Sequence, residues 1–119
     1  MKNLLEKNIK MISDDINIIK RKLTNKIEKI GVFGSMLEKP FNKANDVDVV
    51  IYCKENYELV KHELLNLELS IPISPHKMNG MYGFKENETT SKHYHIILLN
   101  SASPNKEFER INQGKIAFI

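Results

Sequence analysis

Apolar residues recur every three or four positions over the first part of the chain. The stripe consists of Leu5, Ile9, Ile12, Ile16, Ile19 and Leu23. This spacing places the six side chains on one face of a helix of about twenty residues. Polar residues fill the positions between them and would face solvent. The pattern therefore predicts one long N-terminal helix that packs against a sheet.

Two apolar runs after this helix predict the first pair of strands. The runs cover residues 27–33 and 46–53, and a polar stretch separates them. A short helix is expected to start at Ser35 and to end before Pro40, because proline disrupts a helix interior. A further helix is predicted over residues 55–67. This β-α-β-α order indicates the α/β (α+β) class, with a small mixed β-sheet flanked by helices.

The second half of the chain has a less regular pattern. Residues 67–73 alternate like a strand, and the proline within them favours an edge position. Residues 74–90 contain proline, glycine and many polar side chains, so they are expected to form mostly loop or hairpin. Residues 93–99 predict a clear strand. Residues 103–114 and 115–119 are expected to add a closing helix and a short last strand.

Composition limits the class of protein. The 119 residues are 41% hydrophobic, which is enough for one globular domain over residues 1–119. No segment approaches the roughly eighteen apolar residues of a membrane span, so no membrane association is expected. The single cysteine, Cys53, cannot form an internal disulfide, which favours a reducing cytoplasmic location. The net charge of +3 is compatible with a polyanionic partner but does not require one.

The strongest chemical signal lies where the first predicted strand ends. The run finishes in Gly34-Ser35, and Asp46 and Asp48 open the next strand. Gly34 and Ser35 would begin the short helix, where backbone amides and the helix dipole favour a phosphate. Asp46 and Asp48 would point to one face of their strand and repel each other, unless a cation such as Mg²⁺ lies between them. Enzymes that transfer phosphoryl or nucleotidyl groups need a phosphate site beside a metal site, so this pattern favours such a function.

This arrangement resembles the DNA polymerase β-like nucleotidyltransferase superfamily. The signature of that superfamily is an apolar residue, Gly-Ser, a spacer, and two carboxylates separated by an apolar residue. The chain matches it with Phe33-Gly34-Ser35 and Asp46-Val47-Asp48-Val49. The small size is similar to that of its minimal branch. The resemblance implies that Gly34 and Ser35 bind a nucleoside triphosphate such as ATP. It also implies that Asp46 and Asp48 hold Mg²⁺ while a nucleoside monophosphate passes to an acceptor.

The resemblance further implies a third carboxylate on a neighbouring strand, and here the chain departs from the pattern. The strand in question is residues 93–99, where the matching position is His95. No aspartate or glutamate occurs between Glu88 and Glu107. The third metal ligand of the superfamily therefore has no direct counterpart in this strand.

Three explanations of this departure remain open at the level of sequence. His95 could replace the acid, either as a general base or as a ligand that suits Mn²⁺ or Zn²⁺ better than Mg²⁺. Glu68 could supply the carboxylate from the predicted edge strand. Alternatively, the site could be impaired and the fold kept as a nucleotide- or partner-binding module. His93 and His95 could also be ordinary strand residues that face solvent.

The acceptor and the partner are implied only in outline. Minimal relatives often pair with a helical partner protein, and the acceptor could be a protein, an RNA or a small molecule. Residues 74–90 or such a partner would then select the acceptor. Lys39 and Lys43, in the spacer between the two half-motifs, could meet triphosphate oxygens, although lysines in loops are usually just solvated.

Overall fold

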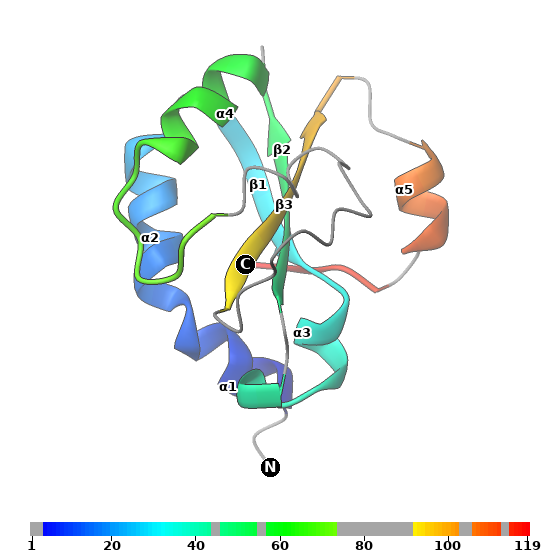
Figure 1. The fold of residues 1–119 in the computed structure, drawn as a ribbon. Coiled ribbons are helices and arrows are strands. Elements are labelled where there is room, and N and C mark those ends of the chain that lie inside the picture. The colour runs from blue at the N-terminus through cyan, green and yellow to red at the C-terminus, as the bar shows by residue number, and fades with distance from the viewer. Residues whose placement is uncertain (1–3, 44–45, 55–56, 74–91, 103–105, 113–114) are drawn as a thin grey trace, which may run out of the picture.

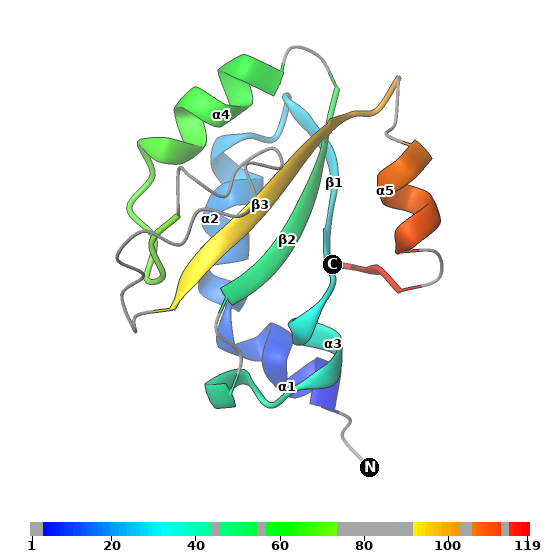
Figure 2. The ribbon, with the colours of Figure 1, turned by 45° about the vertical axis from the view of Figure 1, so that its right-hand side comes forward.

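The computed structural model describes residues 4–43, 46–54, 57–73, 92–102, 106–112 and 115–119. Within these residues the helices enclose a sheet: α2 and α4 lie on one face, α5 lies on the other, and α1 and α3 lie at one end (Figure 1, Figure 2). The elements in chain order are α1 (Leu4–Met11), α2 (Ser13–Lys22), β1 (Ile27–Val32), α3 (Ser35–Glu38), the 3-10 turn η1 (Phe41–Lys43), β2 (Asp46–Cys53), α4 (Tyr57–Leu65), β3 (His93–Asn100), α5 (Lys106–Ile111) and β4 (Ala117–Phe118).

The sheet is mixed, as predicted. Its strand order is β3-β2-β1-β4. β1 is antiparallel to both β2 and β4, whereas β2 and β3 are parallel. The parallel pair places the start of β2 beside the start of β3. The predicted α/β class with a small mixed sheet is confirmed.

The predicted N-terminal helix is interrupted. The structure has two helices, α1 and α2, with a break at Ile12, where φ is −113° and ψ is 8°. The hydroxyl of Ser13 donates a hydrogen bond to the carbonyl of Lys10 (3.0 Å). Such local bonds compete with helical hydrogen bonds and bend or break a helix. The prediction of a single helix is therefore wrong, although the apolar stripe still faces the core.

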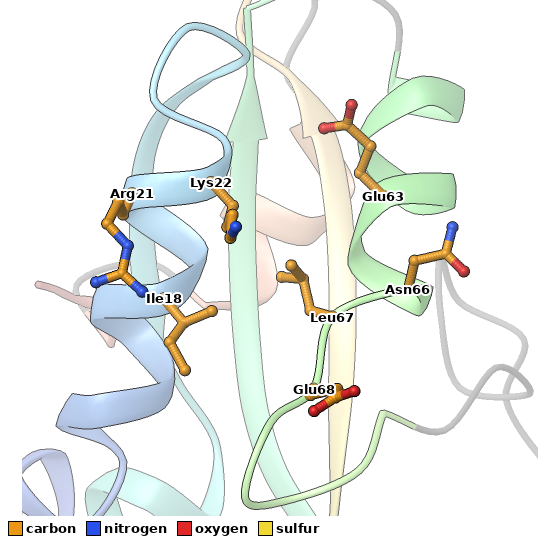
Figure 3. Close-up of a pocket in the computed structure, with 7 residues that line it drawn as sticks. All are labelled: Ile18, Arg21, Lys22, Glu63, Asn66, Leu67 and Glu68. Carbon is orange, nitrogen blue, oxygen red and sulfur yellow. The ribbon is translucent and has the colours of Figure 1, made fainter.

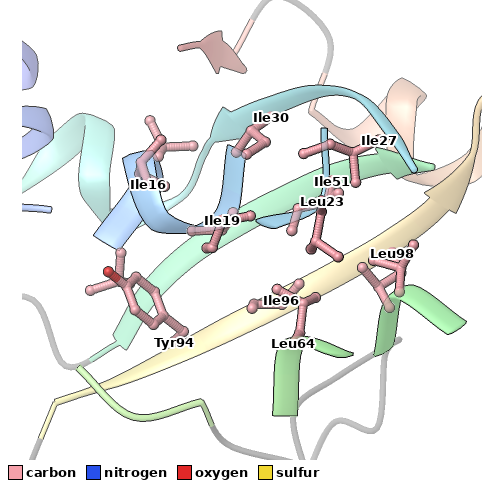
Figure 4. Packing of buried hydrophobic residues seen from close by; sticks show 14 of the residues in the cluster. Ile16, Ile19, Leu23, Ile27, Ile30, Ile51, Leu64, Tyr94, Ile96 and Leu98 are labelled. Atoms are coloured by element: carbon pink, nitrogen blue, oxygen red, sulfur yellow. The ribbon is translucent and has the colours of Figure 1, made fainter. Parts of the chain in front are cut away.

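Most of the core lies between α2, α4 and one face of the sheet (Figure 4). The buried residues of this cluster are Ile12, Ile16, Ile19, Leu23, Ile27, Ile30, Val32, Met36, Val47, Val49, Ile51, Cys53, Val60, Leu64, Tyr94, Ile96 and Leu98. Cys53 is fully buried, and burial raises its pKa to about 11. A smaller cluster lies on the opposite face of the sheet and includes Phe33, which directly follows β1, and Phe108 of α5.

The segment after α4 does not form the predicted edge strand. Its backbone amides at Ser70 and Ile71 donate to the carboxylate of Asp15 in α2, at 2.8 and 3.2 Å, instead of to a strand. Among the residues that the structure describes, the segment is joined to β3 by an isolated bridge between Ile73 and Tyr94. Because these amides bind Asp15, they are not paired with a neighbouring strand. The strand that the alternating pattern of residues 67–73 predicted is therefore wrong.

Asp15 is 2% exposed and also accepts a hydrogen bond from the hydroxyl of Tyr94 (2.7 Å). Burial, together with the Asp15 carboxylate, raises the pKa of Tyr94, so the hydroxyl keeps its proton and remains a donor. A buried carboxylate with three donors is well satisfied. It thereby ties α2, β3 and the segment after α4 together.

Several expectations fall outside the described residues. They are the loop or hairpin at 74–90, the start of the closing helix at 103–104 and its end at Gly114. Of the closing elements, α5 and the two-residue strand β4 are seen. None of the described helices has the length and apolar character needed to cross a membrane.

Candidate functional site

The parallel pairing of β2 and β3 brings two aspartates and two histidines together. Asp46 lies opposite His93, and Asp48 lies opposite His95. The intervening Val47 is fully buried in the main core cluster, whereas both aspartates are only partly buried. Since side chains alternate along a strand, Asp46 and Asp48 share the face that carries α5. This agrees with the predicted orientation of the pair.

Asp48 is in direct contact with His95. Oδ1 of Asp48 lies 3.0 Å from Nδ1 of His95, and the two side chains are only 18% and 12% exposed. The imidazole also meets the ring of Phe33 edge-on, with 6.4 Å between ring centroids. Phe33 in turn packs against Phe108 of α5 at 5.2 Å. The aromatic cluster thus forms one wall of the site.

Gly34 lies directly against the carboxylate of Asp48. Its φ is +63° and its ψ is −133°, a conformation that residues with a side chain rarely adopt. A Cβ at this position would overlap Oδ2 of Asp48. The amide of Phe33 donates to the carbonyl of Asp48 (3.1 Å), which extends the β1–β2 pairing up to the turn. The glycine is therefore required by the close approach of the Asp48 carboxylate.

Ser35 links the two halves of the motif. It is the first residue of α3, and its hydroxyl donates to the backbone carbonyl of Asp46 (3.2 Å). This bond connects the Gly34-Ser35 turn with the first residue of β2 across the intervening spacer. Gly34, Ser35, Asp46 and Asp48 are thus neighbours in space, as the motif predicted. Their catalytic and binding roles stay predictions.

Asn8 of α1 holds α3 in place, and the sequence reasoning missed it. Its side chain is 1% exposed, and its Nδ2 donates to the carbonyls of Met36 (2.9 Å) and Lys39 (2.8 Å). These carbonyls belong to the end of α3, where a helix leaves acceptors without partners. The sequence did contain a signal for this role: Asn8 is a polar residue three positions after Leu5, on the side of the helix that carries the apolar stripe.

Asn8→Ala should therefore loosen α3 and the turn before it. The buried carbonyl of Met36 and the partly buried carbonyl of Lys39 would lose their donor, which costs about 1–3 kcal/mol. We expect a lower melting temperature and weaker binding of a nucleoside triphosphate than in the unaltered protein, measured by thermal denaturation and by titration. Asn17→Ala is the matched control, because Asn17 is exposed on α2. Equal effects of the two substitutions would contradict the role of Asn8.

Lys92, which directly precedes β3, is a second residue that the sequence reasoning missed. Its Nζ donates to the carbonyl of Phe41 (2.7 Å) and lies 4.6 Å above the centre of the Phe41 ring. Burial lowers the pKa of Lys92, and the negative charge of Asp46 acts in the opposite direction. Lys39 and Lys43, in contrast, are exposed. Lys92 thus brings a cation close to Asp46 and fixes η1 against β3.

Glu68 lies on the other side of the molecule. It lines an open hollow of about 570 Å³ between α2 and the segment after α4, together with Arg21 and Asn66 (Figure 3). Its neighbours Leu67 and Leu69 pack on the core cluster of the α2 face. The explanation in which Glu68 completes the set of acids is therefore wrong.

The side chains at the site fit one hard cation better than a metal centre with many protein ligands. Asp46 and Asp48 offer carboxylate oxygens on one face, as Mg²⁺ and Mn²⁺ prefer. The described part of the chain contains no group of three or more histidines, cysteines or acids arranged to hold a metal. The third acid of the resemblance is thus not found among these residues, and the residue opposite Asp48 on β3 is His95, which the resemblance matches to that acid.

Comparison with known proteins gives one family. The model of the family described as "Polymerase beta, Nucleotidyltransferase" matches residues 15–118, which include the Gly34-Ser35 turn, both aspartates and His95. Neither the search of curated proteins nor the search of solved structures gives a match. The family match covers most of the chain.

Proposed function

Because the chain belongs to the polymerase β nucleotidyltransferase family, we propose that it transfers a nucleoside monophosphate from a nucleoside triphosphate to an acceptor. A nucleotidyltransferase-type function follows from the family; the triphosphate, the acceptor and the metal dependence are part of the proposal. The observation that carries it is the placement of Asp46 and Asp48 on one face, beside the Gly34-Ser35 turn. The acceptor in this proposal is a protein, an RNA or a small molecule.

In this proposal, Asp46 and Asp48 hold Mg²⁺ or Mn²⁺, and Gly34 and Ser35 bind the triphosphate. The metal would offset negative charge on the transferring and leaving oxygens. Gly34 allows close approach to the turn because it carries no side chain. The oxygen of an acceptor hydroxyl would lose its proton to water and form a bond to the α-phosphorus, the bond from that phosphorus to the α,β-bridging oxygen would break, and pyrophosphate would leave.

The test is a transfer assay with triphosphates labelled at the α-phosphate. The unaltered protein is incubated with each nucleotide and Mg²⁺ or Mn²⁺, alone and with protein or RNA acceptors. We expect metal-dependent release of pyrophosphate together with transfer of the label, and loss of both with a chelator. Label transfer that persists in the chelator, or in the Asp46→Asn variant, would count against the proposed site.

A second candidate is a domain that binds nucleotide or a partner without transfer. In its favour, the residue opposite Asp48 on β3 is a histidine, His95, at the position that the resemblance matches to an acid. The same assay separates the candidates when it is combined with a binding titration. Metal-dependent nucleotide binding without pyrophosphate release from any nucleotide would favour the binding domain.

A further inference from the structure

The carboxylate of Asp48 is confined from two sides. Its Oδ1 lies 3.0 Å from Nδ1 of His95, on the neighbouring strand. Its Oδ2 faces Gly34 so closely that a Cβ there would overlap it. Rotation of the carboxylate would break the contact with His95 or press against the Gly34 backbone. The site therefore favours one orientation of Asp48.

The imidazole of His95 is confined as well. The ring of Phe33 meets it edge-on, at an interplanar angle of 61°, and Phe33 is held by Phe108 of α5. The second ring nitrogen, Nε2, is buried, and the whole side chain is 12% exposed. Nδ1 therefore faces the carboxylate of Asp48, and Nε2 is closed to solvent.

The contact with Asp48 also determines which atom carries a hydrogen. A carboxylate only accepts hydrogen bonds, so Nδ1 of His95 donates. With that hydrogen on Nδ1, the lone pair of a neutral imidazole is on Nε2, and Nε2 is buried, so it is not open to a metal or to an acceptor hydroxyl. The geometry thus argues against a direct contact of His95 with the reacting atoms.

We propose that His95 is a positioning residue that acts through Asp48 and is neither the general base nor a metal ligand. The inference rests on the proposed function, since Asp48 matters as a metal ligand. Histidine donors and carboxylates that orient one another around a metal are common, and the loss of such a partner lowers metal affinity about 10–100-fold. His95 would then keep Asp48 in place without supplying the missing acid.

The test compares three substitutions by titration of the full chain with Mn²⁺, monitored by electron paramagnetic resonance. The amide nitrogen of asparagine can take the place of Nδ1, whereas that of glutamine lies near the place of Nε2. We expect His95→Ala and His95→Gln to weaken Mn²⁺ binding about 10–100-fold, and His95→Asn to stay within about threefold of the unaltered protein. Transfer activity should follow the same order.

The outcomes distinguish this inference from the function on which it rests. If the unaltered protein does not bind Mn²⁺, the proposed function fails and the inference fails with it. If it binds Mn²⁺ but all three variants lose binding or activity equally, His95 acts directly and only the inference fails. Retained Mn²⁺ affinity in His95→Ala would also overturn it.

A second measurement needs no substitution, so it remains decisive if the variants do not fold. Nitrogen NMR of the protein with labelled histidine reports which ring nitrogen carries hydrogen. We expect a protonated Nδ1 on His95, whose ring signals are assigned through their connectivity to the backbone of His95. A bare Nδ1 would overturn the proposal, because it could not donate to the Asp48 carboxylate.

Discussion

Asp48→Asn should abolish metal-dependent binding of a nucleoside triphosphate while the fold remains intact. The amide removes the negative charge that would hold the cation, yet its oxygen can still accept the hydrogen bond from His95. Since a bound metal ion contributes several kcal/mol, the loss should be on the order of 100-fold or more in affinity and in any transfer rate. Titration with nucleotide and Mn²⁺ measures the first quantity, and thermal denaturation checks the fold.

The control is the same chemical change at Asp14, which is exposed in the first turn of α2. Asp14→Asn should leave nucleotide binding unchanged. If Asp48→Asn bound nucleotide and Mn²⁺ as well as the unaltered protein does, Asp48 would not be a metal ligand, and the site would have to lie elsewhere.

Gly34→Ala should have a comparable effect on the site and a larger one on stability. Alanine is strained at a φ of +63°, and its Cβ would displace the Asp48 carboxylate. Backbone strain and steric overlap together should cost about 2–4 kcal/mol of unfolding free energy. At roughly 4 °C for each kcal/mol, the melting temperature should fall by about 8–16 °C. Metal-dependent nucleotide binding should be lost even at temperatures where the variant is folded.

Gly31→Ala separates loss of stability from loss of the site. The added Cβ would meet the side chains of Ile116 and Phe118, on the β4 side of β1, and not Asp48. We expect it to destabilise the protein by about 1–3 kcal/mol and to preserve nucleotide binding in the folded protein. If the Gly34→Ala variant bound nucleotide normally, the site would not require a residue without a side chain at position 34.

The core of the site could be predicted from sequence because it depends on local patterns. Alternation in β2 places Asp46 and Asp48 on one face, and the Gly34-Ser35 turn follows directly from the end of β1. His95 was also placed correctly, opposite Asp48, because β3 reads as a clear strand. The packing of its ring was not predictable, since it involves Phe33 and, through Phe33, the distant Phe108 of α5.

The features that sequence reasoning missed depend on contacts between distant segments. Asp15 binds the amides of the segment after α4, and so an alternating pattern does not become a strand. Asn8 and Lys92 reach the backbone of α3 and η1, a use of side chains that leaves almost no periodic signal. Such polar contacts are specified by the assembled fold and not by residue spacing.

The most direct test of the account is a crystal structure of the protein soaked with a non-hydrolysable nucleoside triphosphate and Mn²⁺, with anomalous data at the manganese edge. The account predicts an anomalous peak bound by the carboxylates of Asp46 and Asp48, and a triphosphate that contacts Gly34 and Ser35. A metal and triphosphate bound elsewhere, for example in the hollow that Arg21 and Glu68 line, would contradict it.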